Sequence, residues 1–111
     1  MKTLTDKGIE KILARFSDSL DHATYQQGKR QVSVDIYKID IQRNRIKIYV
    51  LLGSDVSGSI RNIALVDRDG DTVAVAEREF VKPASKGIYS VFSYQIMETD
   101  DPDAPLLGGE S

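Results

Sequence analysis

The densest group of reactive side chains in the sequence is DRDGD at residues 67–71, which places three carboxylates around a glycine. Carboxylates at alternate positions occur in calcium-binding loops, where a twelve-residue segment also needs Gly at its sixth position and Glu at its twelfth. Counted from Asp67, those positions hold Thr72 and Arg78. The spacing therefore favours a hairpin turn, and we predict no metal site.

Groups suited to acid–base or covalent catalysis are scarce. The chain has no Cys and a single His, which excludes disulfides, thiolate metal sites and Cys nucleophiles. His22 follows the predicted helix in a polar segment, and no Ser lies at a recognisable nucleophile turn. We therefore predict no catalytic residue, no cofactor site and no enzymatic activity.

Basic residues and tyrosines are interleaved between positions 37 and 49. Such a mixture suits three roles: contacts to nucleic acid, contacts to an acidic protein, or protection of a sheet edge against aggregation. We favour edge protection and predict no nucleic-acid partner. The cluster contains Tyr37, Lys38, Arg43, Arg45, Lys47 and Tyr49, of which Tyr37, Arg43, Arg45 and Lys47 are the predicted interaction residues.

These side chains need a scaffold, which the apolar pattern outlines. Residues 3–20 predict the single helix, because apolar residues recur there at the 3.6-residue period. That stripe consists of Ile9, Ile12, Leu13, Phe16 and Leu20. Thr5 is a candidate N-cap, and Asp6 suits the positive end of the helix dipole. Residues 21–30 are then expected to form a polar connector.

A period-two pattern, typical of strands, begins at residue 32. Its phase changes between Ile36 and Tyr37, which indicates either a bulge or a strand that is apolar on both faces. A turn at Arg43-Asn44 aligns apolar residues across a hairpin. The predicted pairs are Ile41 with Ile46, Ile39 with Ile48, and Tyr37 with Val50.

A second hairpin is predicted at Asp69-Gly70, one of the strongest short turn signals, joining residues 60–67 to 71–80. Its predicted pairs are Val66 with Val73, Leu65 with Ala74, Ala64 with Val75, and Ile63 with Ala76. Both faces are apolar, so we expect the hairpin to lie centrally, with a close neighbour packed on Ala64, Ala74 and Ala76. A loop at 81–87 and a last strand at 88–97 complete the chain.

The 111 residues, 41% hydrophobic and 29% charged, fit one globular domain of the α+β class. We predict one N-terminal amphipathic helix packed on a mainly antiparallel sheet of about five strands, within residues 1–98. Residues 99–111 are expected to form a flexible acidic tail, since they are rich in Asp, Pro and Gly and contain no base. No apolar run approaches the ~20 residues that span a bilayer, so we expect a cytoplasmic protein without a membrane partner.

Three stretches resemble the N-terminal domain of phage tail-collar and tail-fibre proteins. The family pattern has a helix of the form L-T-x-x-G-x-x-x-I-A, a hairpin of the form R-x-I-G-L-x-D-x-D-G-x-x-I-A-V, and a Lys-Pro before the last strand. The corresponding segments here are residues 4–14, residues 61–75 and Lys82-Pro83. Ala64 departs from the pattern, because it stands where the family has Gly.

The resemblance implies a non-enzymatic structural or adaptor protein of a prophage tail, fibre or baseplate. It would be made in the cytoplasm and end in a virion or phage-like particle. Its expected partners are other tail or baseplate proteins and further copies of itself in a homo-oligomer. The alternative is a small cytosolic ligand-binding protein or enzyme whose site lies between helix and sheet.

Overall fold

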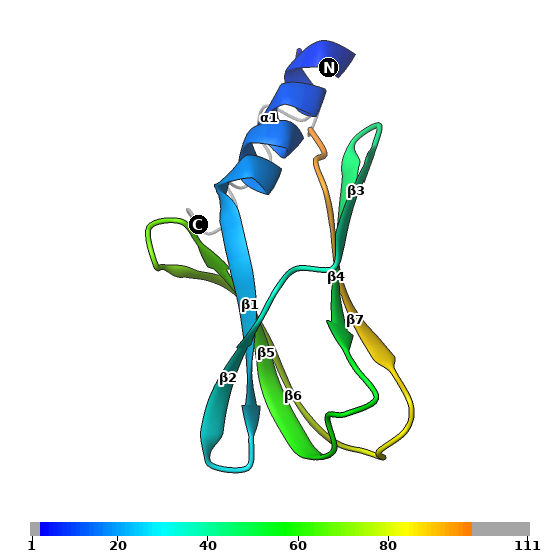
Figure 1. Cartoon of the computed structure of the whole chain (residues 1–111). Coiled ribbons are helices and arrows are strands. Elements are labelled where there is room, and N and C mark those ends of the chain that lie inside the picture. Colours follow the sequence, from blue (N-terminus) through cyan, green and yellow to red (C-terminus); the bar gives the residue numbers. More distant parts are fainter. Residues whose placement is uncertain (1–2, 99–111) are drawn as a thin grey trace, which may run out of the picture.

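The computed structural model describes residues 3–98, and the predicted acidic tail at 99–111 lies outside the described residues. Within the described residues, one helix and seven strands follow one another (Figure 1). Their bounds are α1 Asp6–Ser19, β1 Leu20–Gln27, β2 Arg30–Val34, β3 Lys38–Gln42, β4 Arg45–Leu52, β5 Gly58–Asp67, β6 Thr72–Lys82 and β7 Ile88–Gln95. No helix in this part of the chain is long and apolar enough to cross a membrane.

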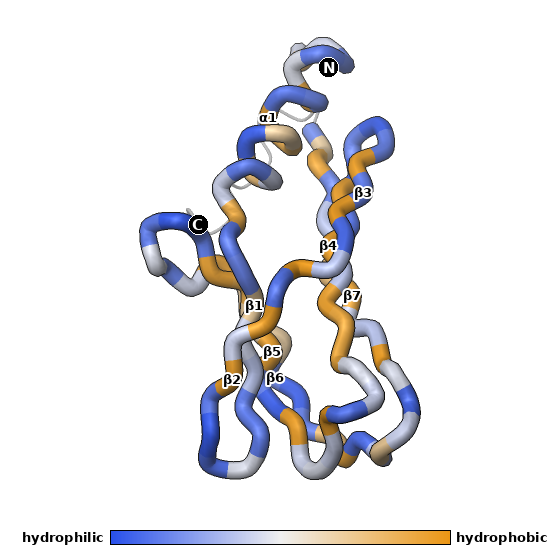
Figure 2. Tube along the Cα trace, viewed as in Figure 1, coloured by the Kyte–Doolittle hydropathy of each residue, from blue (hydrophilic) through white to orange (hydrophobic). Residues whose placement is uncertain are grey.

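The strands form two antiparallel sheets, with the orders β2-β1-β5-β6 and β3-β4-β7. The predicted combination of one helix with antiparallel strands is confirmed, whereas the single sheet of about five strands was wrong. Ile46 and Ile48 of β4 and Ile60 and Leu65 of β5 are completely buried in one core shared by the two sheets. Hydrophilic residues gather at the tips of the β1–β2 and β3–β4 hairpins (Figure 2).

The helix begins where its sequence provides a cap. The Thr5 hydroxyl accepts a hydrogen bond from the Gly8 amide at 3.0 Å, as predicted for an N-cap. Ile9 and Leu13 are buried in the core, whereas Ile12, predicted to share their stripe, is 46% exposed. Because α1 lies at one end of the two sheets (Figure 1), only part of its apolar face is covered.

Strand β1 occupies most of the segment predicted as a polar connector, and that prediction was wrong. The strand lies inside its sheet between β2 and β5, where Leu20 and residues 23–25 are buried. Polar residues surround these positions, so neither strict alternation nor a long apolar run marks the strand in the sequence. His22 is therefore a strand residue, and its Nδ1 lies 2.7 Å from Oδ2 of Asp21.

The change of phase between Ile36 and Tyr37 marks the passage from one sheet to the other. β2 ends at Val34 in the first sheet, and β3 begins at Lys38 in the second. The sequence favoured a bulge or a two-faced strand within one sheet. Instead, residues 35–37 lie outside both strands. The alternation between inward and outward side chains therefore starts anew in β3, independently of the alternation in β2.

Both predicted reverse turns are present. Around Arg43-Asn44, the pairs Ile41–Ile46 and Ile39–Ile48 form as predicted, while Tyr37 lies just before β3. Around residues 68–71, the pairs Leu65–Ala74, Ala64–Val75 and Ile63–Ala76 are confirmed. Val66 faces Thr72 rather than Val73, because the register shifts beside the loop. β5 is internal but β6 is an edge strand, so the prediction of a central hairpin was right only for β5.

A buried lysine joins two loops at the end of the molecule away from α1. The Lys82 side chain is 1% exposed. Its ammonium donates to three backbone carbonyls, those of Val56 at 2.6 Å, Pro83 at 3.2 Å and Lys86. An ammonium has three N–H donors, so every donor is satisfied. A backbone hydrogen bond of 3.0 Å from Ser85 to Ser54 also connects these loops.

Candidate functional site

The outer side of sheet β3-β4-β7 carries an aromatic group that we call the tyrosine face, formed by Tyr37, Lys38, Tyr49, Tyr89 and Val91. The ring centroids of Tyr37 and Tyr89 are 5.4 Å apart, and those of Tyr49 and Tyr89 are 6.2 Å apart in an edge-on arrangement. Tyr37 and Tyr89 are more than half exposed. Clustered aromatic side chains open to solvent are typical of a contact surface.

Strand pairing brings these residues together from separate parts of the chain. Tyr49 lies opposite Lys38 on one neighbouring strand and opposite Val91 on the other, and Tyr89 lies opposite Leu51. Directly paired residues in an antiparallel sheet point to the same side. The register therefore places Lys38, Tyr49, Tyr89 and Val91 on one face, while the intervening residues of β4 point into the core. Tyr37 lies just before β3 and joins this face through the contact of its ring with Tyr89.

The electrostatics of the tyrosine face favour neutral hydroxyl groups beside a cation. Lys38 Nζ lies 5.7 Å from the centroid of the Tyr49 ring, within the range of a cation–π interaction. A hydrogen bond with the Tyr37 side chain raises the pKa of Tyr89 above its usual value. Tyr89 therefore stays protonated at neutral pH and keeps an O–H group for hydrogen bonding.

The predicted interaction residues of the basic stretch lie on or near this face. Tyr37 belongs to it, and Arg45 and Lys47 are on the same side of β4 as Tyr49. Lys47 lies opposite Asp40 in the β3–β4 pair. The fourth predicted residue, Arg43, lies at the turn between β3 and β4, where its φ is 56°. It lines a pocket instead of the tyrosine face.

The three alanines that were predicted to contact a close neighbour belong to the other sheet, β2-β1-β5-β6. Ala74 and Ala76 pack against the core, and Ala64 is only 6% exposed. Their small size is explained by close packing, and the exposed large apolar residues on that hairpin are Val73, Val75 and Val81. The structure thus does not bring the alanines together with the basic stretch.

Tyr89 and Val91 were not among the predicted interaction residues. Alternation along residues 88–97 already placed both on one side of the last strand. The missing information was strand order, because only the pairing of β7 with β4 sets Tyr89 beside Tyr37 and Tyr49.

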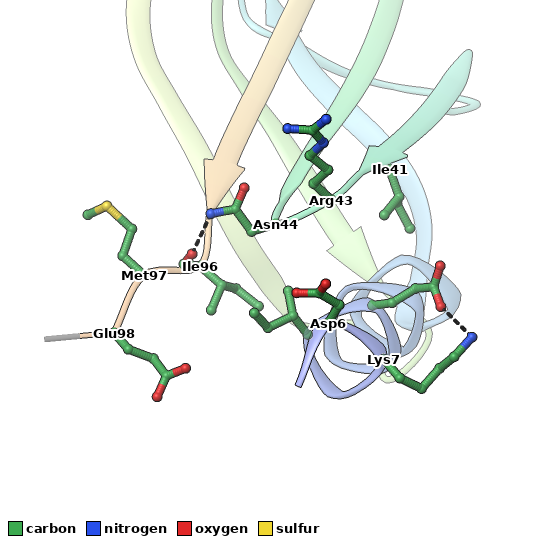
Figure 3. A pocket seen from close by; sticks show the side chains of 10 residues that line it. Asp6, Lys7, Ile41, Arg43, Asn44, Ile96, Met97 and Glu98 are labelled. Carbon is green, nitrogen blue, oxygen red and sulfur yellow. Dashed lines mark hydrogen bonds and ion pairs between the residues drawn. The ribbon is translucent and has the colours of Figure 1, made fainter. Parts of the chain in front are cut away.

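A pocket of about 1080 Å³ lies between the start of α1 and the far end of the second sheet. Figure 3 shows Asp6 and Lys7 on its helix side and Ile41 and Ile96 on its sheet side. It is lined by Asp6, Lys7, Ile9, Glu10, Ile41, Arg43, Asn44, Ile96, Met97 and Glu98. Both charge signs and several apolar groups are present, as in many small-molecule sites.

Several polar groups of this pocket already have partners. Lys7 Nζ lies 2.9 Å from Glu10 Oε1, and Asn44 Nδ2 donates to the Ile96 carbonyl at 2.9 Å (Figure 3). The Glu98 carboxylate accepts two backbone amides from residues 3–4, each at 3.0 Å. Only the Glu98 contacts join the segment before the helix to the segment after β7, whereas the other two are internal to the helix and to the end of the sheet.

The acidic group at 67–71 also has a local role. The carboxylates of Asp67, Asp69 and Asp71 offer oxygens within 4.8 Å of one another. Asp67 Oδ1 accepts the amides of Asp69 at 3.0 Å and Asp71 at 2.9 Å, which shapes the hairpin loop. Arg68 donates from Nε to the Asp18 carbonyl at 2.8 Å. Asp18 lies in the last turn of α1, and a positive charge is stabilising at the C-terminal end of a helix.

Comparison of the chain with family models, with curated proteins and with solved structures found no match. The resemblance to phage tail-collar proteins therefore stays a prediction that rests on the sequence motifs.

Proposed function

We propose that this protein is a non-enzymatic docking module, a structural or adaptor component of a phage-like tail, fibre or baseplate. The observation that carries the proposal is the tyrosine face, which presents exposed aromatic rings on a rigid sheet. Tyr is enriched at protein interfaces because it combines a large apolar area with a hydroxyl that finds a polar partner. The tail context comes from the sequence resemblance.

Several residues of the resembling motifs have structural roles in this chain. Thr5 caps α1, Asp67 binds two loop amides, and Lys82 connects two loops. Gly70 adopts a φ of 87°, which L side chains rarely tolerate. These residues maintain the scaffold of the domain.

The pocket beside α1 is the basis of the alternative, a ligand-binding protein or enzyme. We place it second, since Lys7, Glu10, Asn44 and Glu98 already make hydrogen bonds there. A pocket built for a ligand usually directs polar groups into its space.

The proposal is tested by asking whether the protein enters particles. Phage-like particles would be induced from the source strain, purified by density, and analysed by quantitative mass spectrometry. We expect the wild-type chain in the particles and a reduction of about tenfold or more for the double variant Tyr37→Ser/Tyr89→Ser, because central aromatic residues dominate docking energies.

The matched control is Val73→Ser/Val75→Ser, which removes two exposed apolar side chains from the other sheet and should enter particles normally. Absence of the wild-type chain from particles would reject the tail assignment. Equal incorporation of all three forms would show that the tyrosine face is not the docking surface.

A further inference from the structure

Strand β7 is an edge strand among the strands of residues 3–98. It pairs with β4 on one side, and no strand of the described chain lies on its other side. The Ile96 amide donates to the carbonyl of Asn44, its partner in the continued register. Hydrogen-bonded pairs alternate in an antiparallel ladder, so the even-numbered residues of β7 bond to β4. Residues 89, 91, 93 and 95 therefore direct their N–H and C=O groups outward.

The other three edge strands of residues 3–98 carry features that discourage pairing. β2 and β3 have five residues each, with Arg30 in one and Lys38 and Asp40 in the other. β6 is long, but it contains the charged run Glu77–Glu79 and a register shift at that point. Charges, short length and bulges are the usual means by which edge strands avoid other chains.

Strand β7 has none of these features. Its eight residues, IYSVFSYQ, include no charge, no Pro and no Gly, and its register with β4 is regular throughout. Tyr89, Val91 and Tyr94 on this strand are each more than 40% exposed. A regular, uncharged and partly apolar edge of this kind is a template for another strand.

We propose that β7 pairs antiparallel with β7 of a second copy of this chain, so that two three-stranded sheets become one continuous sheet across a two-fold axis. Near the two-fold axis, each residue of the strand lies opposite itself or a near neighbour of the same strand. A charge in the middle of the strand would then lie close to a like charge, and β7 has no charged residue. The outward groups of residues 89, 91, 93 and 95 gain partners, while the ladder to β4 is kept.

The same pairing joins the side chains on the outer side. Tyr89 and Val91 of the two copies come to lie on adjacent strands, where aromatic and β-branched residues form favourable cross-strand pairs. The two tyrosine faces then become one surface across the axis. This inference goes beyond the proposed role in a tail and does not depend on it.

The test is sedimentation equilibrium of the purified full chain at micromolar concentration. We expect a dimer for the wild type and a dissociation constant raised about a hundredfold or more in Ser93→Glu, because like charges would be placed close together across the axis. Within one chain the new carboxylate would lie opposite Lys47, a pairing that does not oppose the fold. Ser33→Glu, an exposed change on edge strand β2, should leave the dimer intact. Circular dichroism would show that both variants keep the wild-type fold.

Two further variants keep the test decisive. Ser93→Pro removes an amide that points away from β4, so it should abolish the dimer while retaining the fold. The chain has no Cys, so a single introduced Cys reports contact between copies. A short thiol crosslinker should join two copies of the Ser93→Cys variant and should not join two copies of the Ser33→Cys variant. A monomeric wild type, equal effects of the two Glu variants, or no crosslink at position 93 would overturn the proposal.

Discussion

The ammonium group of Lys82 lies inside the protein and is surrounded by three backbone carbonyls from two loops. Replacing it by an apolar side chain of similar length, in Lys82→Met, leaves these carbonyls without their charge-assisted donors. We expect the free energy of unfolding to fall by about 2–4 kcal/mol. Denaturant titration followed by circular dichroism measures this change.

Lys86→Met is the matched control, because that side chain is exposed and only its backbone carbonyl contacts Lys82. It should change stability by no more than about 0.5 kcal/mol. If both variants unfolded at the same denaturant concentration, the buried ammonium would not be a determinant of stability.

At the scale of single elements, two hairpins were predictable, and strand β1 with its hairpin to β2 was not. Turn residues such as Asp69-Gly70 act locally, so most of the register of the two predicted hairpins followed from the sequence. β1 could not be recognised, because its sequence has no apolar pattern typical of a strand. Residues 23–25 are buried because β1 lies between β2 and β5. Lys82 was equally hidden, because a Lys in a loop-like sequence is normally solvated.

The loop between β5 and β6 depends on one carboxylate. In Asp67→Ala, the amides of Asp69 and Asp71 lose their shared acceptor, and we expect a loss of about 1–3 kcal/mol in unfolding free energy. Asp69→Ala, at an exposed position of the same loop, should have little effect. A reversed order of these two variants in thermal unfolding would contradict the role given to Asp67.

The candidate site belongs to the scale of the whole molecule, and for that reason only part of it was predictable. Tyr37, Arg45 and Lys47 come from one hairpin whose register is local. Tyr89 joins them through a pairing between residues about forty positions apart in the sequence, and strand order over such distances is not encoded in any short pattern. The division of the strands into two sheets could not be predicted from the sequence for the same reason.

The two sheets share one core, so they should unfold together. Leu65→Ala in the first sheet and Ile48→Ala in the second both remove completely buried side chains, and each should cost about 2–5 kcal/mol. Most tyrosines lie in or beside the second sheet, so tyrosine fluorescence reports mainly that sheet, whereas far-ultraviolet circular dichroism reports the secondary structure of the whole molecule. We expect coincident transitions for both variants, with Val75→Ala as an exposed control. Separate transitions would show that the sheets are independent units.

The junction of α1 and β1 has a geometric consequence. No residue separates Ser19 from Leu20, and Arg68 binds the carbonyls of Asp18 and Ser19 from the neighbouring hairpin. These contacts hold the end of the helix beside the β5–β6 loop and leave no linker in which the direction of the chain could change. Any partner that contacts the exposed side of α1 would therefore be oriented relative to the first sheet by this junction.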